Sequence, residues 1–158
     1  MWTAMTSAPA LFPPPPYPEP SSLRDYLVVD DNRALAENLA EIIECEGHAS
    51  VQIALSGAAA LRLVRVTRFD GIVSDMRMPL MGGAELIHRA RLLDPELPVI
   101  IISAYTSDAD LDAVRREGPI AILPKPVPVE RLLRLLAGAR RVARTDRDGG
   151  EVDRSFSC

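Results

Sequence analysis

The chain of 158 residues has few cysteines, no excess of positive charge and no long apolar run, and each shortage excludes a class of protein. Cys45 and Cys158 are too few for a disulfide-dense secreted scaffold or a Cys-rich zinc site. A net charge of −4 argues against nucleic-acid binding as the main role. No apolar run reaches the ~18 residues of a membrane span, and the first residues do not resemble a secretory signal. We therefore expect a cytoplasmic protein with no membrane span.

Lysine is almost absent as well. Of the 18 lysine and arginine residues, only Lys125 is a lysine. In a chain that uses arginine everywhere else, one lysine indicates a position where a guanidinium group does not serve. Codon bias, which leaves a few lysines by chance, is the alternative explanation.

Proline and charged residues divide the chain into three parts. Seven of the 14 prolines lie between Pro9 and Pro20, and proline lacks the N–H that helices and sheets need. We therefore predict a Pro-rich disordered extension over residues 1–22, with a ligand for an aromatic groove as the alternative. Residues 144–158 are polar and charged and predict a flexible tail. Residues 23–143 remain as one domain.

Within residues 23–143, short apolar runs alternate with apolar residues at helical spacing. The runs are β-branched and apolar on both faces, which is typical of a parallel sheet covered on both sides. We predict an α/β fold in which a five-stranded parallel sheet carries five helices on its two faces. The first helix is expected to bury Leu35, Leu39, Ile42 and Ile43, with Cys45 as a small buried group. The predicted strands are residues 26–29, 49–55, 71–73, 99–102 and 120–123, and the candidate helix N-caps include Asn32, Ser56 and Ser107.

The residues that follow the predicted strands carry the chemistry. In an open parallel sheet, ligands bind beyond the carboxyl ends of the strands. Asp30 and Asp31 follow the first run, Asp75 follows the third, Ser103 ends the fourth and Lys125 follows the fifth. Carboxylates, a hydroxyl group and an ammonium group should therefore meet at one edge of the sheet.

Each of these residues alone has an ordinary explanation as a helix cap, a turn residue or a surface charge. Together they are harder to dismiss, because three nearby carboxylates repel one another unless positive charge intervenes. Lys125 supplies one charge, and Mg²⁺, which binds carboxylates, water and phosphate oxygens, would supply the rest. His48 and His88 are isolated, so no His/Cys set competes for zinc.

The order and spacing of these residues resemble a known family, the receiver domain of bacterial two-component response regulators. The resemblance spans residues 26–137 and implies the flavodoxin-like strand order 2-1-3-4-5. Only fifteen residues follow residue 143, so we expect a stand-alone receiver without a DNA-binding domain. The matching motifs are Leu27–Asn32 (LVVDDN), Ser74–Gly83 (SDMRMPLMGG), Ser103-Ala104 and Lys125-Pro126.

The resemblance also implies an acceptor and its metal ligands. Asp75 would accept a phosphoryl group from a histidine kinase or a phosphotransfer protein and become an acyl phosphate. Asp31 would bind Mg²⁺ directly, and Asp30 would help through a water molecule. The backbone carbonyl group of Arg77 would complete the protein ligands.

Further roles and one departure follow from the same resemblance. Lys125 would pair with the phosphoryl oxygens as a compact charge, and Ser103 would hydrogen-bond the phosphoryl group. Pro126 would follow a cis peptide bond that aims Lys125 into the site. Receivers usually carry Tyr or Phe three residues before this lysine, but here Ile122 stands there. We therefore expect altered signalling through helix four, strand five and helix five, with Tyr105 as a candidate substitute.

The residues two past the acceptor and two past the hydroxyl group border the approach of the hydrolytic water in this family. Here these residues are Arg77 and Tyr105, and both are large. We expect Arg77 to lie along the phosphoryl oxygens and Tyr105 to cover the remaining opening, so that the phosphorylated form is long-lived.

The leading hypothesis is a response regulator that signals through contacts with an unidentified protein target, with a homodimer as one option. A Mg²⁺-dependent aspartyl phosphatase is one alternative, although Arg77 stands where such enzymes carry a second Asp. A phosphorylation-independent receiver-like scaffold is the other alternative. Ile122 favours the scaffold, whereas the intact Asp31, Asp75, Ser103 and Lys125 oppose it.

Overall fold

The computed structural model describes residues 23–104 and 108–139. The expected N-terminal extension, the expected tail and the end of the expected domain at residues 140–143 lie outside the described residues. Tyr105 and the candidate cap Ser107 also lie outside them.

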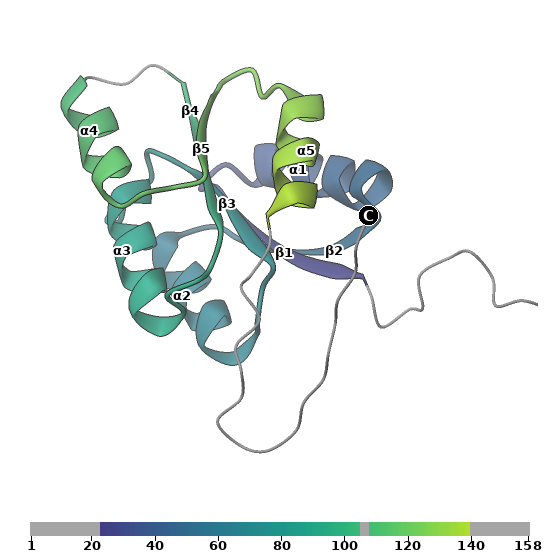
Figure 1. Ribbon diagram of the computed structural model, residues 1–158, viewed down its shortest axis with the longest axis horizontal. Helices are drawn as coiled ribbons and strands as arrows, with labels where there is room; N and C mark the ends of the chain where they lie inside the picture. Colours follow the sequence, from purple (N-terminus) through teal and green to yellow (C-terminus); the bar gives the residue numbers. More distant parts are fainter. Residues whose placement is uncertain (1–22, 105–107, 140–158) are drawn as a thin grey trace, which may run out of the picture.

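The sheet has the predicted strands in the predicted order. All neighbouring strands are parallel, and their order is β2-β1-β3-β4-β5. Figure 1 shows the sheet between two groups of helices. The α/β fold and the strand order 2-1-3-4-5 are therefore confirmed. The strands are β1 (Arg24–Val29), β2 (Ala49–Ala54), β3 (Gly71–Asp75), β4 (Val99–Ser103) and β5 (Ala121–Pro124).

Five helices connect and follow these strands. Helices α1 and α5 pack on one face of the sheet, and α2, α3 and α4 pack on the other (Figure 1). Asn32 and Ser56 cap α1 and α2 as predicted, because their side chains accept hydrogen bonds from the backbone N–H groups of Leu35 and Ala59. In the ranges that the structure describes, no helix has the length and apolar character to cross a membrane. The helices are α1 (Arg33–Gly47), α2 (Gly57–Val66), α3 (Gly83–Leu93), α4 (Asp108–Arg116) and α5 (Val129–Gly138).

The central strands explain why the apolar runs are continuous. Every residue of β3 and β4 is buried. Along β1, Leu27 and Val29 join the core beneath α2, α3 and α4, whereas Tyr26 and Val28 join the core beneath α1 and α5. Successive side chains of a strand point to opposite faces, so a strand covered on both sides is apolar at every position.

The expected core face of α1 is partly wrong. The helix buries Ala36, Ala40 and Ile43, whereas Leu35 is 50% exposed. The face of α1 that meets the sheet thus carries two small alanines, and the larger Leu35 lies outside that face. Cys45 is exposed, contrary to the expectation of a buried group. It lies two residues past Ile43, which is about 200° around the helix and therefore on the opposite side.

Candidate functional site

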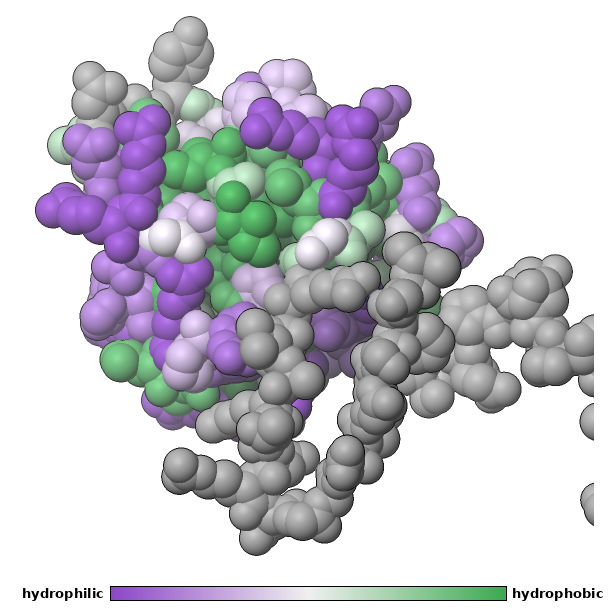
Figure 2. All heavy atoms as spheres, viewed as in Figure 1, coloured by the Kyte–Doolittle hydropathy of each residue, from purple (hydrophilic) through white to green (hydrophobic). Residues whose placement is uncertain are grey.

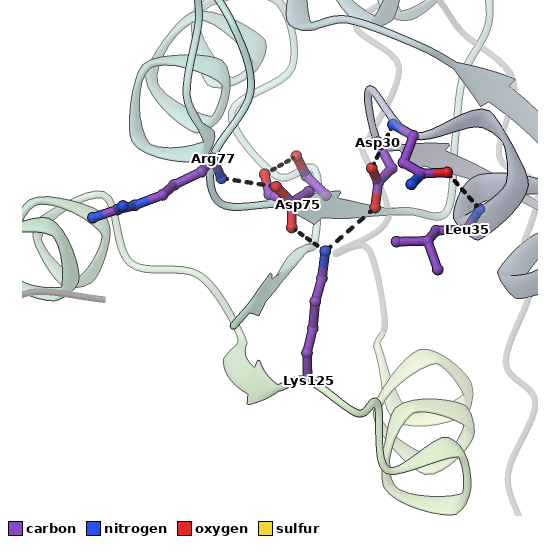
Figure 3. Close-up of polar contacts among 7 residues, drawn as sticks. Asp30, Leu35, Asp75, Arg77 and Lys125 are labelled. Atoms are coloured by element: carbon purple, nitrogen blue, oxygen red, sulfur yellow. Dashed lines mark hydrogen bonds and ion pairs between the residues drawn. The ribbon is translucent and has the colours of Figure 1, made fainter. Parts of the chain in front are cut away.

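The carboxyl ends of β1, β3 and β5 bring two carboxylates to one ammonium group. Nζ of Lys125 lies 2.6 Å from Oδ1 of Asp75 and 3.6 Å from Oδ2 of Asp30. Figure 3 shows Lys125 reaching up between the two acids. Opposite charges at these distances attract strongly where water is partly excluded, and the Asp75 side chain is only 9% exposed. The expected meeting of charges at this edge therefore includes Asp30, Asp75 and Lys125.

The carboxylate of Asp75 is oriented at both of its oxygens. It ends the fully buried strand β3, and its Oδ2 accepts a hydrogen bond of 2.9 Å from the backbone N–H of Arg77. The other oxygen faces Lys125. Gly83 lets α3 begin close to the end of β3. A Cβ atom at this position would lie only 3.2 Å from Cα of Met76, which is tighter than ordinary van der Waals contact. The loop between β3 and α3 can therefore fold back against the acceptor residue.

Lys125 is positioned by the neighbouring strand. Its backbone N–H donates a hydrogen bond of 2.8 Å to the carbonyl oxygen of Ser103, and Ser103 itself is buried at the end of β4. The peptide bond between Lys125 and Pro126 is cis. The structure thus places the predicted hydroxyl residue and the predicted lysine on adjacent strand ends.

The surroundings of Lys125 keep its side chain charged. Burial alone would lower the pKa of Lys125. The hydrogen bond and charge of Asp75, together with those of Asp30, outweigh that effect and leave the pKa above its ordinary value. Lys125 is therefore a permanent cation near neutral pH.

The acidic pair is split between the site and the surface. Asp30 faces Lys125, and its Oδ1 accepts a hydrogen bond of 2.8 Å from the backbone N–H of Asn32. Asp31 is exposed. Over residues 23–104 and 108–139, no group of three or more His, Cys, Asp or Glu side chains is gathered so that it could hold a metal ion. Two of the three expected carboxylates therefore meet at Lys125.

Arg77 has its backbone at the site and its side chain elsewhere. Nη2 of Arg77 lies 2.6 Å from Oδ2 of Asp110 in α4. In Figure 3 the Arg77 side chain runs away from Asp75 toward that helix. Without a phosphoryl group on Asp75, the Arg77 side chain pairs with Asp110 and does not lie over the acceptor. The expectation that it lies along the phosphoryl oxygens concerns the phosphorylated form and stays a prediction. Sequence reasoning missed Asp110, and no spacing marks two residues 33 positions apart as a pair.

Ile122 lies where the family usually carries an aromatic ring. It is half-buried in β5 and packs against the core beneath α2, α3 and α4. It also lines an open groove of about 840 Å³, together with Ser103, Leu111 and Arg115. Apolar surface is visible between α4 and α5 in Figure 2. The departure from the family therefore falls on an exposed groove next to the strand ends.

Comparison with known proteins decides the family. Residues 26–137 match the response regulator receiver domain. The chain belongs to this family. It is 57% identical over 113 residues to a response regulator receiver protein of Anaeromyxobacter sp. (strain Fw109-5), covering 72% of this chain and 47% of that protein. It is 36% identical over 132 residues to the response regulator MprA of Mycolicibacterium vanbaalenii, covering 83% of this chain and 57% of that protein. The chain thus spans about half the length of these curated relatives.

Solved structures agree on the receiver fold. A CheY-like receiver domain from Methanospirillum hungatei superimposes with a TM-score of 0.69 at 30% identity, covering 73% of this chain and 92% of that one. A response regulator from Burkholderia pseudomallei, solved with a phosphorylated aspartic acid, calcium and citrate, gives a TM-score of 0.65 at 30% identity, covering 72% of this chain and 66% of that one. Receiver domains act in two-component signalling and are signalling modules rather than classical enzymes.

The contact between Lys125 and Asp75 should be measurable as a coupling energy. We expect Lys125→Met to reduce the free energy of unfolding by about 1.5–3 kcal/mol more in the wild type than in an Asp75→Asn background, because only the wild type loses a charged hydrogen bond. Urea unfolding of the four proteins at neutral pH measures this difference. Since the pKa of Lys125 is raised, the contribution is complete below about pH 10.5 and is lost as the pH rises through the folded-state pKa.

A surface pair serves as the control for this cycle. Nη1 of Arg33 lies 3.5 Å from Oε1 of Glu37 on the exposed side of α1. The cycle of Arg33→Gln and Glu37→Gln should give only about 0.3–0.5 kcal/mol. An equal loss from Lys125→Met in both backgrounds would contradict the proposed geometry.

Proposed function

We propose that Asp75 is the phosphoryl acceptor of this chain in a two-component or phosphorelay pathway. The carboxylate of Asp75 at the end of β3, held between the Arg77 N–H group and the Lys125 ammonium group, is the observation that carries this proposal. Membership of the receiver family supports it, as does the phosphorylated aspartic acid of the Burkholderia pseudomallei relative. The donor would be a histidine kinase or a phosphotransfer protein.

The proposed transfer needs little from the protein beyond position and charge. An oxygen of Asp75 attacks the phosphorus atom, and the bond between phosphorus and the donor's histidine nitrogen breaks. That nitrogen keeps the electron pair, and Asp75 becomes an acyl phosphate. Lys125 balances the charge that gathers on the phosphoryl oxygens, and its compact ammonium group can follow them as they move. Ser103, buried at the next strand end, would hydrogen-bond the phosphoryl group.

Magnesium fits the donor chemistry of this edge. Asp30 and Asp75 already share one cation, so their oxygens lie close enough for a shared charge. Mg²⁺ prefers such hard oxygen ligands and keeps several waters. Asp30, Asp31, Asp75 and the backbone carbonyl group of Arg77 would hold the ion, and when bound it neutralises charge on the phosphoryl oxygens.

We infer that the domain acts in the cytoplasm and passes its signal to a protein target, or to a second copy of itself. The open groove beside Ile122 is the feature that supports a protein partner, because it leaves apolar surface at the edge of the site. An aspartyl phosphatase is disfavoured, because Arg77 occupies the position of its second carboxylate and the family is a signalling one.

Phosphorylation tests the proposal directly. We expect the wild type, incubated with acetyl phosphate and Mg²⁺, to gain the mass of one phosphoryl group, and Asp75→Asn to gain none. Intact-mass spectrometry makes the measurement. Asp112→Asn is the matched control, because it removes an exposed carboxylate on α4 and should leave the gain unchanged. If Asp75→Asn gained a phosphoryl group at the wild-type rate, the assignment would be refuted. If the wild type gained no phosphoryl group, a phosphorylation-independent scaffold would be favoured.

Magnesium should stabilise the fold before any phosphorylation. An ion that binds only the native state adds RT ln(1 + [L]/Kd), which is about 1.4 kcal/mol at a tenfold excess over Kd. Thermal melts with and without millimolar Mg²⁺ should therefore show a rise in Tm for the wild type and a much smaller one for Asp31→Ala. Glu96→Gln is the control, because this exposed residue precedes β4 at the opposite edge of the sheet. A wild-type rise that persists in Asp31→Ala would rule out this site.

A further inference from the structure

Arg77 connects the acceptor residue to helix α4. We propose that it is a positioning residue that changes partners, from Asp110 in the unphosphorylated protein to the phosphoryl group once Asp75 is phosphorylated. The exchange would free the first half of α4. This inference rests on the proposed phosphorylation of Asp75, and it adds a route by which that event reaches another part of the fold.

The connection is direct at both ends. The backbone N–H of Arg77 donates to Oδ2 of Asp75 at 2.9 Å, so any group added to that carboxylate appears beside the root of the Arg77 side chain. The guanidinium group at the far end lies 2.6 Å from Oδ2 of Asp110. The pair bridges a groove of about 560 Å³ between the β3–α3 loop and α4.

The competition between the two partners favours the phosphoryl group. The side chains of Arg77 and Asp110 are 66% and 46% exposed, and exposed ion pairs are weak. A phosphoryl group carries more negative charge than one carboxylate, and its oxygens match the two-pronged geometry of a guanidinium group. Asp75 is nearly buried, so the charge on its phosphoryl group is less screened by water than the charge on Asp110. Arg77 should therefore leave Asp110 when Asp75 is phosphorylated.

In the first half of α4, the half-buried Leu111 packs against the core and Asp110 pairs with Arg77. Among the α4 residues whose side chains the structure describes, only Val114 is buried, and it lies near the end of the helix. The guanidinium group of Arg91 in α3 binds the carbonyl oxygens of Glu117 and Gly118 just past that end. Loss of the Arg77–Asp110 pair should therefore loosen the start of α4 and leave its end anchored.

Such a change would reach the groove beside β5 without an aromatic switch. Leu111 and Arg115 of α4 line that groove together with Ile122. A looser start of α4 alters the position of Leu111, although Ile122 itself cannot rotate as an aromatic ring would. The Arg77–Asp110 pair is therefore a candidate replacement for the readout that this chain lacks.

Hydrogen exchange of the α4 amides tests the inference. We compare the wild type, Arg77→Gln, Asp110→Asn, the double variant and the control Asp112→Asn, before and after treatment with acetyl phosphate and Mg²⁺. Asp112 is the matched control because it is an acid on the same helix whose partner is Arg115 of α4 itself. Before treatment, we expect the α4 amides to exchange about two- to fivefold faster in Arg77→Gln and in Asp110→Asn than in the wild type. The double variant should exchange no faster than either single variant, and Asp112→Asn should exchange like the wild type.

Phosphorylation should then accelerate α4 exchange in the wild type and in Asp112→Asn, but not in Asp110→Asn. The inference is overturned if Asp110→Asn exchanges like Asp112→Asn before treatment, or if phosphorylation accelerates Asp110→Asn as much as the wild type. Intact mass is recorded on the same samples. A wild type that gains no phosphoryl group refutes the proposed function, whereas a wild type that gains it without a change in α4 refutes only the exchange of partners.

Discussion

The ammonium group of Lys125 lies between the carboxylates of Asp30 and Asp75, and the rest of the site depends on this contact. Two carboxylates at neighbouring strand ends would repel each other without it. The same cation orients one oxygen of Asp75, and the Arg77 N–H orients the other, so the carboxylate is held in place for attack. Because Lys125 is a compact charge on a flexible stem, it can stay with the charge when that charge moves from a carboxylate to a phosphoryl group.

The fold makes this contact possible by burying its central strands on both faces. Asp75 ends β3, where every residue is buried, and Lys125 is tied through its backbone to Ser103 at the end of β4. Rigid strands therefore fix the reacting side chains, while the β3–α3 loop and α4 carry fewer buried contacts. A chemical change at Asp75 is then more easily answered by the loop and by α4 than by the sheet.

The sequence was sufficient for the sheet and for most of the site, because both depend on local patterns. Apolar runs on both faces indicate a parallel sheet, and such a sheet places Asp30, Asp75, Ser103 and Lys125 at one edge. The buried face of α1 was not predictable in the same way, because small alanines rather than Leu35 pack on the sheet. The pair of Arg77 with Asp110 is a surface contact between distant segments, and no periodicity marks it.

The position of the phosphoryl group is the most direct test of this account. Reduction of the phosphorylated protein with sodium borohydride converts an aspartyl phosphate into homoserine, and peptide mapping by mass spectrometry then locates the change. We predict homoserine at position 75 alone, because Asp75 is the only described residue that combines a buried strand end with contacts to both Lys125 and the Arg77 N–H. Homoserine at position 30 or 31, or at a site outside this edge of the sheet, would contradict it.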